Sequence, residues 1–130
     1  MKPTKDDFVK AGRDYETQLN EFEKFVEGVL SLNGKVPALT FYERQKYAPL
    51  KFSYCGVRYR FEYCAPKPGA GRIALVAGDG GDCAGAPVFL AINNVGELTA
   101  PDDAGQRWLV GDPLRVEHAF YYIVSRQIGT

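Results

Sequence analysis

The side chains best suited to covalent chemistry in this 130-residue chain are three cysteines and a single histidine. Nucleophilic catalysis needs a side chain such as a thiol beside a base that can take up its proton. Cys83 and His118 could form such a pair. However, Cys83 follows Asp79 and Asp82, and nearby carboxylates raise the pKa of a thiol, whereas a nucleophile needs a lowered pKa. A small enzyme with a site near Cys83 and His118 is therefore only the third hypothesis, and the sequence predicts no catalytic residue.

The number and spacing of the cysteines also bear on disulfides and metals. The number is odd, and the first residues are polar and lack the apolar core of a secretion signal, so we expect free thiols and a cytoplasmic location. No two cysteines form the close Cys-x-x-Cys pair that is typical of zinc sites. The sequence therefore predicts no metal and no cofactor.

The glycine-rich segment 78–86 has the composition of a phosphate-binding or calcium-binding loop. It lacks the Lys-Ser/Thr ending of a P-loop and the closing glutamate of a calcium loop. The adjacent Asp102 and Asp103 would point in different directions, so they do not form an acid–base pair. We interpret segment 78–86 as a flexible connection between strands.

Residues 50–63 determine their own pairing as a β-hairpin. With a two-residue turn at Cys55 and Gly56, every apolar side chain meets another on one face. The opposed pairs are Leu50–Phe61, Phe52–Tyr59 and Tyr54–Val57. Side chains alternate along a strand, so a slip by one residue would move this whole set to the other face. The sequence therefore predicts one buried aromatic face and one polar face.

The polar face of the predicted hairpin is basic. It carries Lys51, Arg58 and Arg60, together with Ser53 and Glu62. Clustered basic side chains are suited to an anionic partner. An acidic protein or another anionic ligand held by Lys51, Arg58 and Arg60 is therefore the second hypothesis. The alternative is that this face meets acidic parts of the same molecule or of a second copy, or faces water.

The net charge of the chain is zero, but the charge is unevenly distributed. Residues 35–72 hold eight basic and two acidic residues, a net +6, whereas residues 1–34 carry −2 and residues 73–130 carry −4. Nucleic-acid platforms combine basic residues with aromatic rings that stack on bases. Here the predicted register directs the hairpin tyrosines to the core, and a net charge of zero differs from that of typical nucleic-acid-binding proteins. The sequence therefore argues against a nucleic-acid partner.

Residues 5–32 are predicted to form a long amphipathic helix. Its apolar positions recur at steps of three and four, the helical period: Phe8, Gly12, Tyr15, Leu19, Phe22, Val26 and Val29. Thr4 is suited to cap the start, and Asn33-Gly34 to follow the end. At 1.5 Å per residue this helix is about 40 Å long, so we expect it to overhang a small sheet.

The apolar face of this helix is wider than one contact with a sheet requires, because Phe25 and Leu32 lie beside the main stripe. Exposed apolar patches mark protein interfaces, and a two-fold axis lets one patch serve both subunits. The sequence thus predicts a homodimer that binds through Phe25 and Leu32. The competing outcome is that both side chains pack under segment 35–49 within one chain.

The remaining elements complete an α+β fold. Short apolar runs predict further strands at 72–77, 87–93, 97–99 and 107–110, and residues 39–42 fit a short edge strand. We expect turn-rich connections at 65–71 and 101–105, and a C-terminal helix that opens at Asp112-Pro113. The predicted fold is one α+β domain over residues 1–130: a long N-terminal helix, an antiparallel β-meander of five to six strands, and a C-terminal helix packed on the same sheet face.

The predicted fold and its surfaces favour a non-enzymatic binding or accessory protein that acts as a homodimer. The wide apolar face of the first helix is the main reason, and the absence of an activated nucleophile is the second. The apolar runs are also far shorter than the about 20 residues that span a bilayer, so we expect no membrane partner.

Overall fold

The N-terminal helix begins where its sequence provides a cap. The computed structural model describes residues 2–129, and helix α1 spans Lys5–Leu30. The Thr4 hydroxyl accepts a hydrogen bond from the Asp7 N–H, and the Asp7 carboxylate accepts one from the Thr4 N–H at 2.8 Å, so the two residues form a capping box. The helix ends two residues before the predicted end, and turns then lead to Gly34, whose φ of +78° suits glycine.

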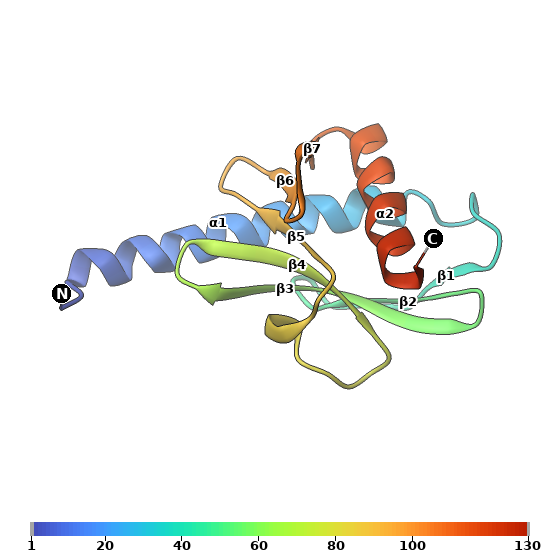
Figure 1. Ribbon diagram of the computed structural model, residues 1–130, viewed down its shortest axis with the longest axis horizontal. Coiled ribbons are helices and arrows are strands. Elements are labelled where there is room, and N and C mark those ends of the chain that lie inside the picture. The colour runs from blue at the N-terminus through green and yellow to red at the C-terminus, as the bar shows by residue number, and fades with distance from the viewer. Residues whose placement is uncertain (1, 130) are drawn as a thin grey trace.

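Seven antiparallel strands follow in meander order, each beside the next (Figure 1). They are β1 (Leu39–Phe41), β2 (Leu50–Tyr54), β3 (Val57–Lys67), β4 (Ala70–Ala77), β5 (Phe89–Ile92), β6 (Glu97–Ala100) and β7 (Asp103–Leu109). A short 3-10 helix, η1 (Cys83–Gly85), lies between β4 and β5, and helix α2 (Pro113–Ile128) follows β7. The predicted α+β class and element order are confirmed, with seven strands in place of five or six.

Two segments that we expected to be connections are partly strand. Within segment 65–71, β3 continues to its end and β4 begins, which leaves Pro68-Gly69 as the turn. Pro66 is tolerated inside β3 because the pairing with β4 is irregular there, so no regular ladder hydrogen bond is lost. Within segment 101–105, β7 already begins at Asp103. Both connections are tighter than composition alone suggests.

The β2–β3 hairpin has the predicted register. The aligned pairs include Leu50–Phe61, Phe52–Tyr59 and Tyr54–Val57. Cys55 and Gly56 have φ values of 52° and 81°, as a two-residue turn with two left-handed positions requires. Phe52 is fully buried, and its ring centroid lies 5.5 Å from that of Tyr59 and 5.2 Å from that of Phe61. The predicted aromatic face is therefore the inner face of the sheet.

Helices α1 and α2 both pack on this inner face. The Phe120 ring of α2 lies 5.8 Å from the Phe52 ring, centroid to centroid. The helices also contact each other at Gly28, where an added Cβ would lie 2.7 Å from Cγ1 of Val116. Glycine at this position therefore permits the close approach. The predicted cap of α2 is confirmed, because the Asp112 carboxylate accepts a hydrogen bond from the Leu114 N–H.

Phe25 and Leu32 lie in the core and not at the surface. Their exposed fractions are 0% and 3%, and the Phe25 ring meets the Phe61 ring edge-on at a centroid distance of 5.2 Å. The expectation that they form an exposed patch is therefore wrong. The physical reason is that α1 contacts α2 as well as the sheet, so it needs an apolar face wider than one contact line.

Glu23 of α1 anchors the segment between β1 and β2. Its carboxylate accepts a hydrogen bond from Arg44 Nη1 at 3.0 Å and from the Tyr47 N–H at 2.7 Å. Arg44 also donates to the Ala48 carbonyl at 3.1 Å through Nε and at 2.7 Å through Nη2. Burial opposes the charge on the carboxylate, but these hydrogen bonds outweigh burial, so the pKa of Glu23 lies below its usual value. This ion pair holds the segment against the helix.

The outer face of the sheet is partly covered by the glycine-rich segment 78–86. Alternation along β4 places Ala74 and Val76 on this face, where Ala86 packs against them in a small apolar cluster. Cys83 and Phe89 lie alongside the same cluster. The segment expected to be a flexible connection is therefore attached to the sheet.

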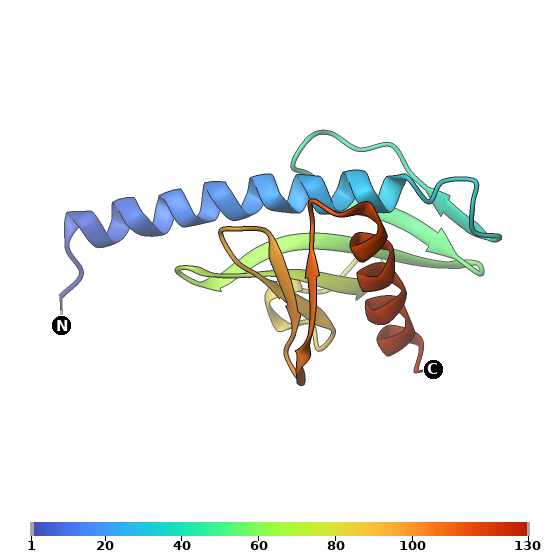
Figure 2. The same ribbon diagram turned by 90° about the horizontal axis from the view of Figure 1, so that it is seen from above.

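The first turns of α1 extend past the β3–β4 turn and beyond the sheet (Figure 2). Phe8 is 68% exposed, Val9 40% and Tyr15 46%. Tyr15 marks the edge of the sheet, because its ring packs edge-on against Tyr63 with centroids 5.2 Å apart. The exposed apolar part of the helix is thus its N-terminal end, which we call the α1 overhang (residues 5–16).

Candidate functional site

Lys51 and Arg58 border a hollow of about 350 Å³ on the outer face of the β2–β3 hairpin. The residues that line it, here called the hairpin hollow, are Tyr42, Lys51, Phe52, Arg58, Tyr59 and Asp79. The Tyr42 N–H donates to the Lys51 carbonyl at 3.0 Å, which fixes Tyr42 beside Lys51. Two of the three predicted anion-binding residues therefore lie together with an aromatic ring and one carboxylate.

Arg58 is only weakly held within the chain. Its Nη1 lies 3.5 Å from Oδ2 of Asp79, and both side chains are about two-thirds exposed, at 65% and 67%. The guanidinium carbon lies 5.9 Å from the centre of the Tyr42 ring, which is within the range of a cation–π contact. Exposed ion pairs contribute only about 0–1 kcal/mol. Arg58 can therefore exchange Asp79 for another anion at little cost.

Arg60, the third predicted anion-binding residue, is buried. Its exposed fraction is 7%, and its guanidinium donates to the carbonyls of Gly78, Gly80 and Gly81 at distances of 2.8–3.2 Å. Its Nε also donates to Glu62 at 3.1 Å. The sequence placed Arg60 on the correct face of the hairpin but did not show that segment 78–86 folds over that face. The guanidinium of Arg60 therefore binds groups of the same chain, and it does not face an external anion.

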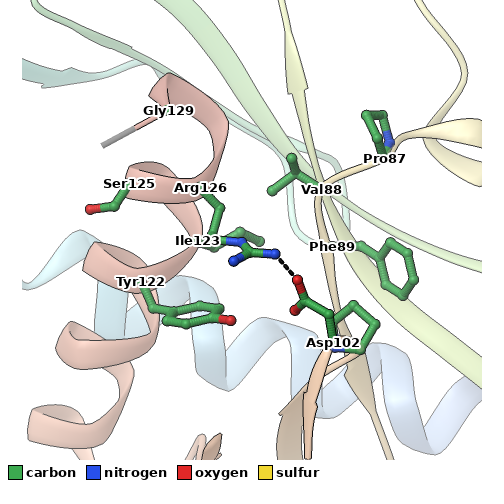
Figure 3. Close-up of a pocket in the computed structure, with 10 residues that line it drawn as sticks. Pro87, Val88, Phe89, Asp102, Tyr122, Ile123, Ser125, Arg126 and Gly129 are labelled. Carbon is green, nitrogen blue, oxygen red and sulfur yellow. Dashed lines mark ion pairs between the residues drawn. The ribbon is translucent and has the colours of Figure 1, made fainter.

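A larger groove, of about 630 Å³, separates the C-terminal half of α2 from the residues that lead into β5 (Figure 3). Arg126 points across the groove and forms an ion pair with Asp102. Its guanidinium carbon lies 5.8 Å from the centre of the Tyr122 ring. Because Arg126 and Asp102 neutralise each other, the groove favours neither anions nor cations. Sequence reasoning missed this groove, since its lining comes from three segments that are distant in the chain.

Cys83 and Cys64 both lie on the outer face, close enough for each thiol to affect the pKa of the other. Burial, followed by hydrogen bonds to Glu62 and Cys64, strongly raises the pKa of the Cys83 thiol. Burial also raises the pKa of Cys64. The predicted effect of a nearby carboxylate on Cys83 is therefore present, but Glu62 exerts it directly instead of Asp79 or Asp82. All three cysteines are free thiols, as predicted.

We predict that Cys83 reacts slowly with iodoacetamide at neutral pH, because a raised pKa leaves little of the reactive thiolate. The exposed Cys55 in the hairpin turn is an internal control of accessibility and should be modified first. Peptide mass spectrometry at several reaction times would measure both rates. A Cys83 that alkylates faster than free cysteine would contradict this prediction.

Cys83 and His118 lie on opposite sides of the sheet. Cys83 packs beside the outer cluster, whereas His118 belongs to α2, which packs on the inner face. The His118 side chain is exposed. It borders a separate hollow together with Trp108 and Arg115. The structure therefore does not bring the proposed thiol and base together.

Metal ligands and membrane spans have recognisable signatures in a structure. Within residues 2–129, no group of three or more His, Cys, Asp or Glu side chains is arranged to hold a metal ion. In the same part of the chain, neither helix combines the length and the apolar character that crossing a membrane requires.

Compared with known proteins, the chain matches no family model, no curated protein and no solved structure. The functional argument therefore depends on the geometry and charge of the surfaces described above. Two of these surfaces have a definite chemical character: the α1 overhang exposes an apolar stripe of Phe8, Val9 and Tyr15, and the hairpin hollow is basic.

Proposed function

We propose that this chain is a non-enzymatic binding protein that acts as a homodimer, with two copies paired through the α1 overhang. The observation that carries the proposal is the exposure of Phe8, Val9 and Tyr15 on one end of a helix that is otherwise packed in the core. Leaving such large apolar side chains together in water is unfavourable, and patches of this kind mark interfaces. The surface differs from the one predicted at Phe25 and Leu32, but the helix is the same.

The charges beside the apolar stripe favour an antiparallel pair. Lys5 and Glu16 are both exposed, and neither forms an ion pair within residues 2–129. They lie about three helical turns apart and therefore on the same flank of the helix. A two-fold axis beside residues 10 and 11 places Lys5 of each copy opposite Glu16 of the other. The self-complementary charges thus make a second copy a suitable occupant of this surface.

The same arrangement gives the Phe8 ring a place to pack. About the axis beside residues 10 and 11, Phe8 of one copy lies near Gly12 of the other. Gly12 has no side chain, and apart from the backbone of its own helix no described residue lies within 4 Å of the position where a Cβ would be. The aromatic ring of one helix can therefore approach the backbone of the other closely.

The properties of Cys83 and His118, the two side chains considered for catalysis, also support a binding role over an enzymatic one. Cys83 has a raised pKa, which disfavours a nucleophile. His118 lies on the far side of the sheet from Cys83, so it is not placed to act as the base for that thiol.

We predict that Phe8→Glu converts the homodimer to a monomer without unfolding the domain. The substitution puts a charge into the centre of the proposed interface, at a side chain that is 68% exposed and makes few contacts within one copy. Sedimentation velocity across a range of concentrations would measure the shift. Leu114→Glu is the matched control, because Leu114 is 59% exposed on α2, beside β7 and away from the α1 overhang, and its substitution should leave the dimer intact.

Charge reversal tests the antiparallel geometry independently. Lys5→Glu and Glu16→Lys should each weaken the dimer, because each puts like charges opposite one another. The double variant should restore the dimer, since the attractive pair is then re-formed with its signs exchanged. A wild-type chain that stays monomeric at high micromolar concentration, or a Leu114→Glu variant that dissociates as readily as Phe8→Glu, would contradict the proposal.

A further inference from the structure

The hairpin hollow is bordered by a lysine whose charge has no ion-pair partner among the described residues. Lys51 lies directly opposite Arg60 on the neighbouring strand, a pairing of like charges that disfavours the sheet unless other groups compensate. Arg60 is compensated by Glu62 and by three backbone carbonyls. The Lys51 ammonium forms no ion pair with any residue in the described part of the chain. The positive charge of Lys51 therefore faces the solvent.

Arg58 adds a second, exposed cation. The centre of the Tyr42 ring lies 5.9 Å from its guanidinium carbon, near the outer limit of a cation–π contact. The carboxylate of Asp79 contacts the guanidinium at 3.5 Å, through a single nitrogen. A guanidinium binds a carboxylate best through two parallel hydrogen bonds, and this internal pair does not achieve that geometry. Asp79 thus occupies the position where an anion can bind Arg58, but it makes only one long contact there.

We propose that the hairpin hollow binds an acidic peptide segment of a partner protein. One carboxylate of that segment replaces Asp79 on Arg58 in a two-pronged contact, and a second pairs with Lys51. The Tyr42 ring covers the side of the bound segment next to Arg58. A hollow of about 350 Å³ is large enough for a few side chains. This surface lies on the hairpin and not on the α1 overhang, so the inference does not depend on the proposed homodimer.

Two features favour a peptide carboxylate over a nucleic acid. Tyr42 is the exposed aromatic ring of the hollow, at 41%, whereas the Tyr59 ring is buried, so successive bases would lack rings to stack on. Asp79 borders the hollow and already places a carboxylate against Arg58, so a carboxylate has the size and shape that fit this position. A short acidic segment needs only to displace Asp79 from this one contact.

Binding of a fluorescein-labelled hexaglutamate peptide, measured by fluorescence anisotropy at low salt, tests the proposal. Arg58→Met should weaken binding about tenfold or more, because it removes the two-pronged contact. Lys51→Met should weaken it by a smaller factor, since an ammonium offers a less directional contact. Asp79→Asn should strengthen binding several-fold, because it removes the competing carboxylate while conserving the size of the side chain.

Three comparisons make the outcome decisive. Lys24→Met on α1 removes the same charge far from the hairpin and should leave binding unchanged. The Phe8→Glu variant should bind the peptide as well as the wild type does, so a failure of the dimer and a failure of this site can be told apart. Absence of binding, an Asp79→Asn variant with no gain, or an oligothymidylate of equal length that binds as tightly as the peptide would each overturn the proposal.

Discussion

Phe52→Ala should lower the free energy of unfolding by about 3–5 kcal/mol. Phe52 is fully buried, and its ring lies against Tyr59, Phe61 and Phe120 with centroids 5.2–5.8 Å apart. Truncation to alanine removes these contacts and leaves a cavity between the hairpin and α2 that the rigid surroundings cannot fill. Chemical denaturation followed by circular dichroism would measure the loss.

Arg58→Ala is the matched control on the other face of the same hairpin. Its side chain is 65% exposed, and its ion pair with Asp79 is long and solvated, so its removal should change stability by about 0.5 kcal/mol or less. Comparable losses for Phe52→Ala and Arg58→Ala would contradict the assignment of inner and outer faces.

Arg60→Met should lower the free energy of unfolding by about 2 kcal/mol. The guanidinium donates to three carbonyls of segment 78–86 and to Glu62, and methionine conserves much of the stem while removing every donor. Because the segment is mostly exposed, water can satisfy the freed carbonyls, which limits the loss. Segment 78–86 should also lose its attachment to the sheet, which limited proteolysis would detect as faster cleavage within it.

Arg58→Met separates the effect of position from the effect of residue type. It removes the same charge two residues away on the same face, but it breaks only an exposed contact with Asp79. We expect little change in stability and no faster cleavage of segment 78–86. If the two variants behaved alike, the carbonyl contacts of Arg60 would have no structural role.

Local patterns in the sequence were enough to predict most of the fold. The β2–β3 register follows from alternation alone, because only one pairing puts Phe52 opposite Tyr59 on an apolar face. The starts of both helices follow from Thr4 and Asp112, whose side chains cap the N–H groups of their own first turns. These features depend on neighbours within a few residues, or on two strands joined by a tight turn.

The lengths of connections were predicted less well. Segment 65–71 contains two prolines and two glycines, a composition typical of loops. In the structure most of it belongs to β3 and β4, because pairing along a long hairpin outweighs the local preference. The strand pairing is irregular near Pro66, where the local preference of proline still disturbs the hairpin.

The candidate site could be predicted only in part. The sequence indicated that Lys51 and Arg58 share a face, and the structure adds Tyr42 and Asp79, which come from other segments. Residues that are distant in the chain meet only when the strands and loops between them are arranged, and no local pattern encodes that meeting. The groove beside Arg126 was missed for the same reason.

The sequence by itself determined which side chains share a face, and only the tertiary structure decided what covers that face. The sequence and the structure both place Phe25 on the apolar side of α1. It is part of the core because α2 and the sheet pack around it. The sequence and the structure both place Arg60 on the polar side of the hairpin. In the structure, segment 78–86 folds over Arg60 and its carbonyls accept hydrogen bonds from the guanidinium. Alternation and helical period are properties of one element, whereas burial is a property of several elements packed together.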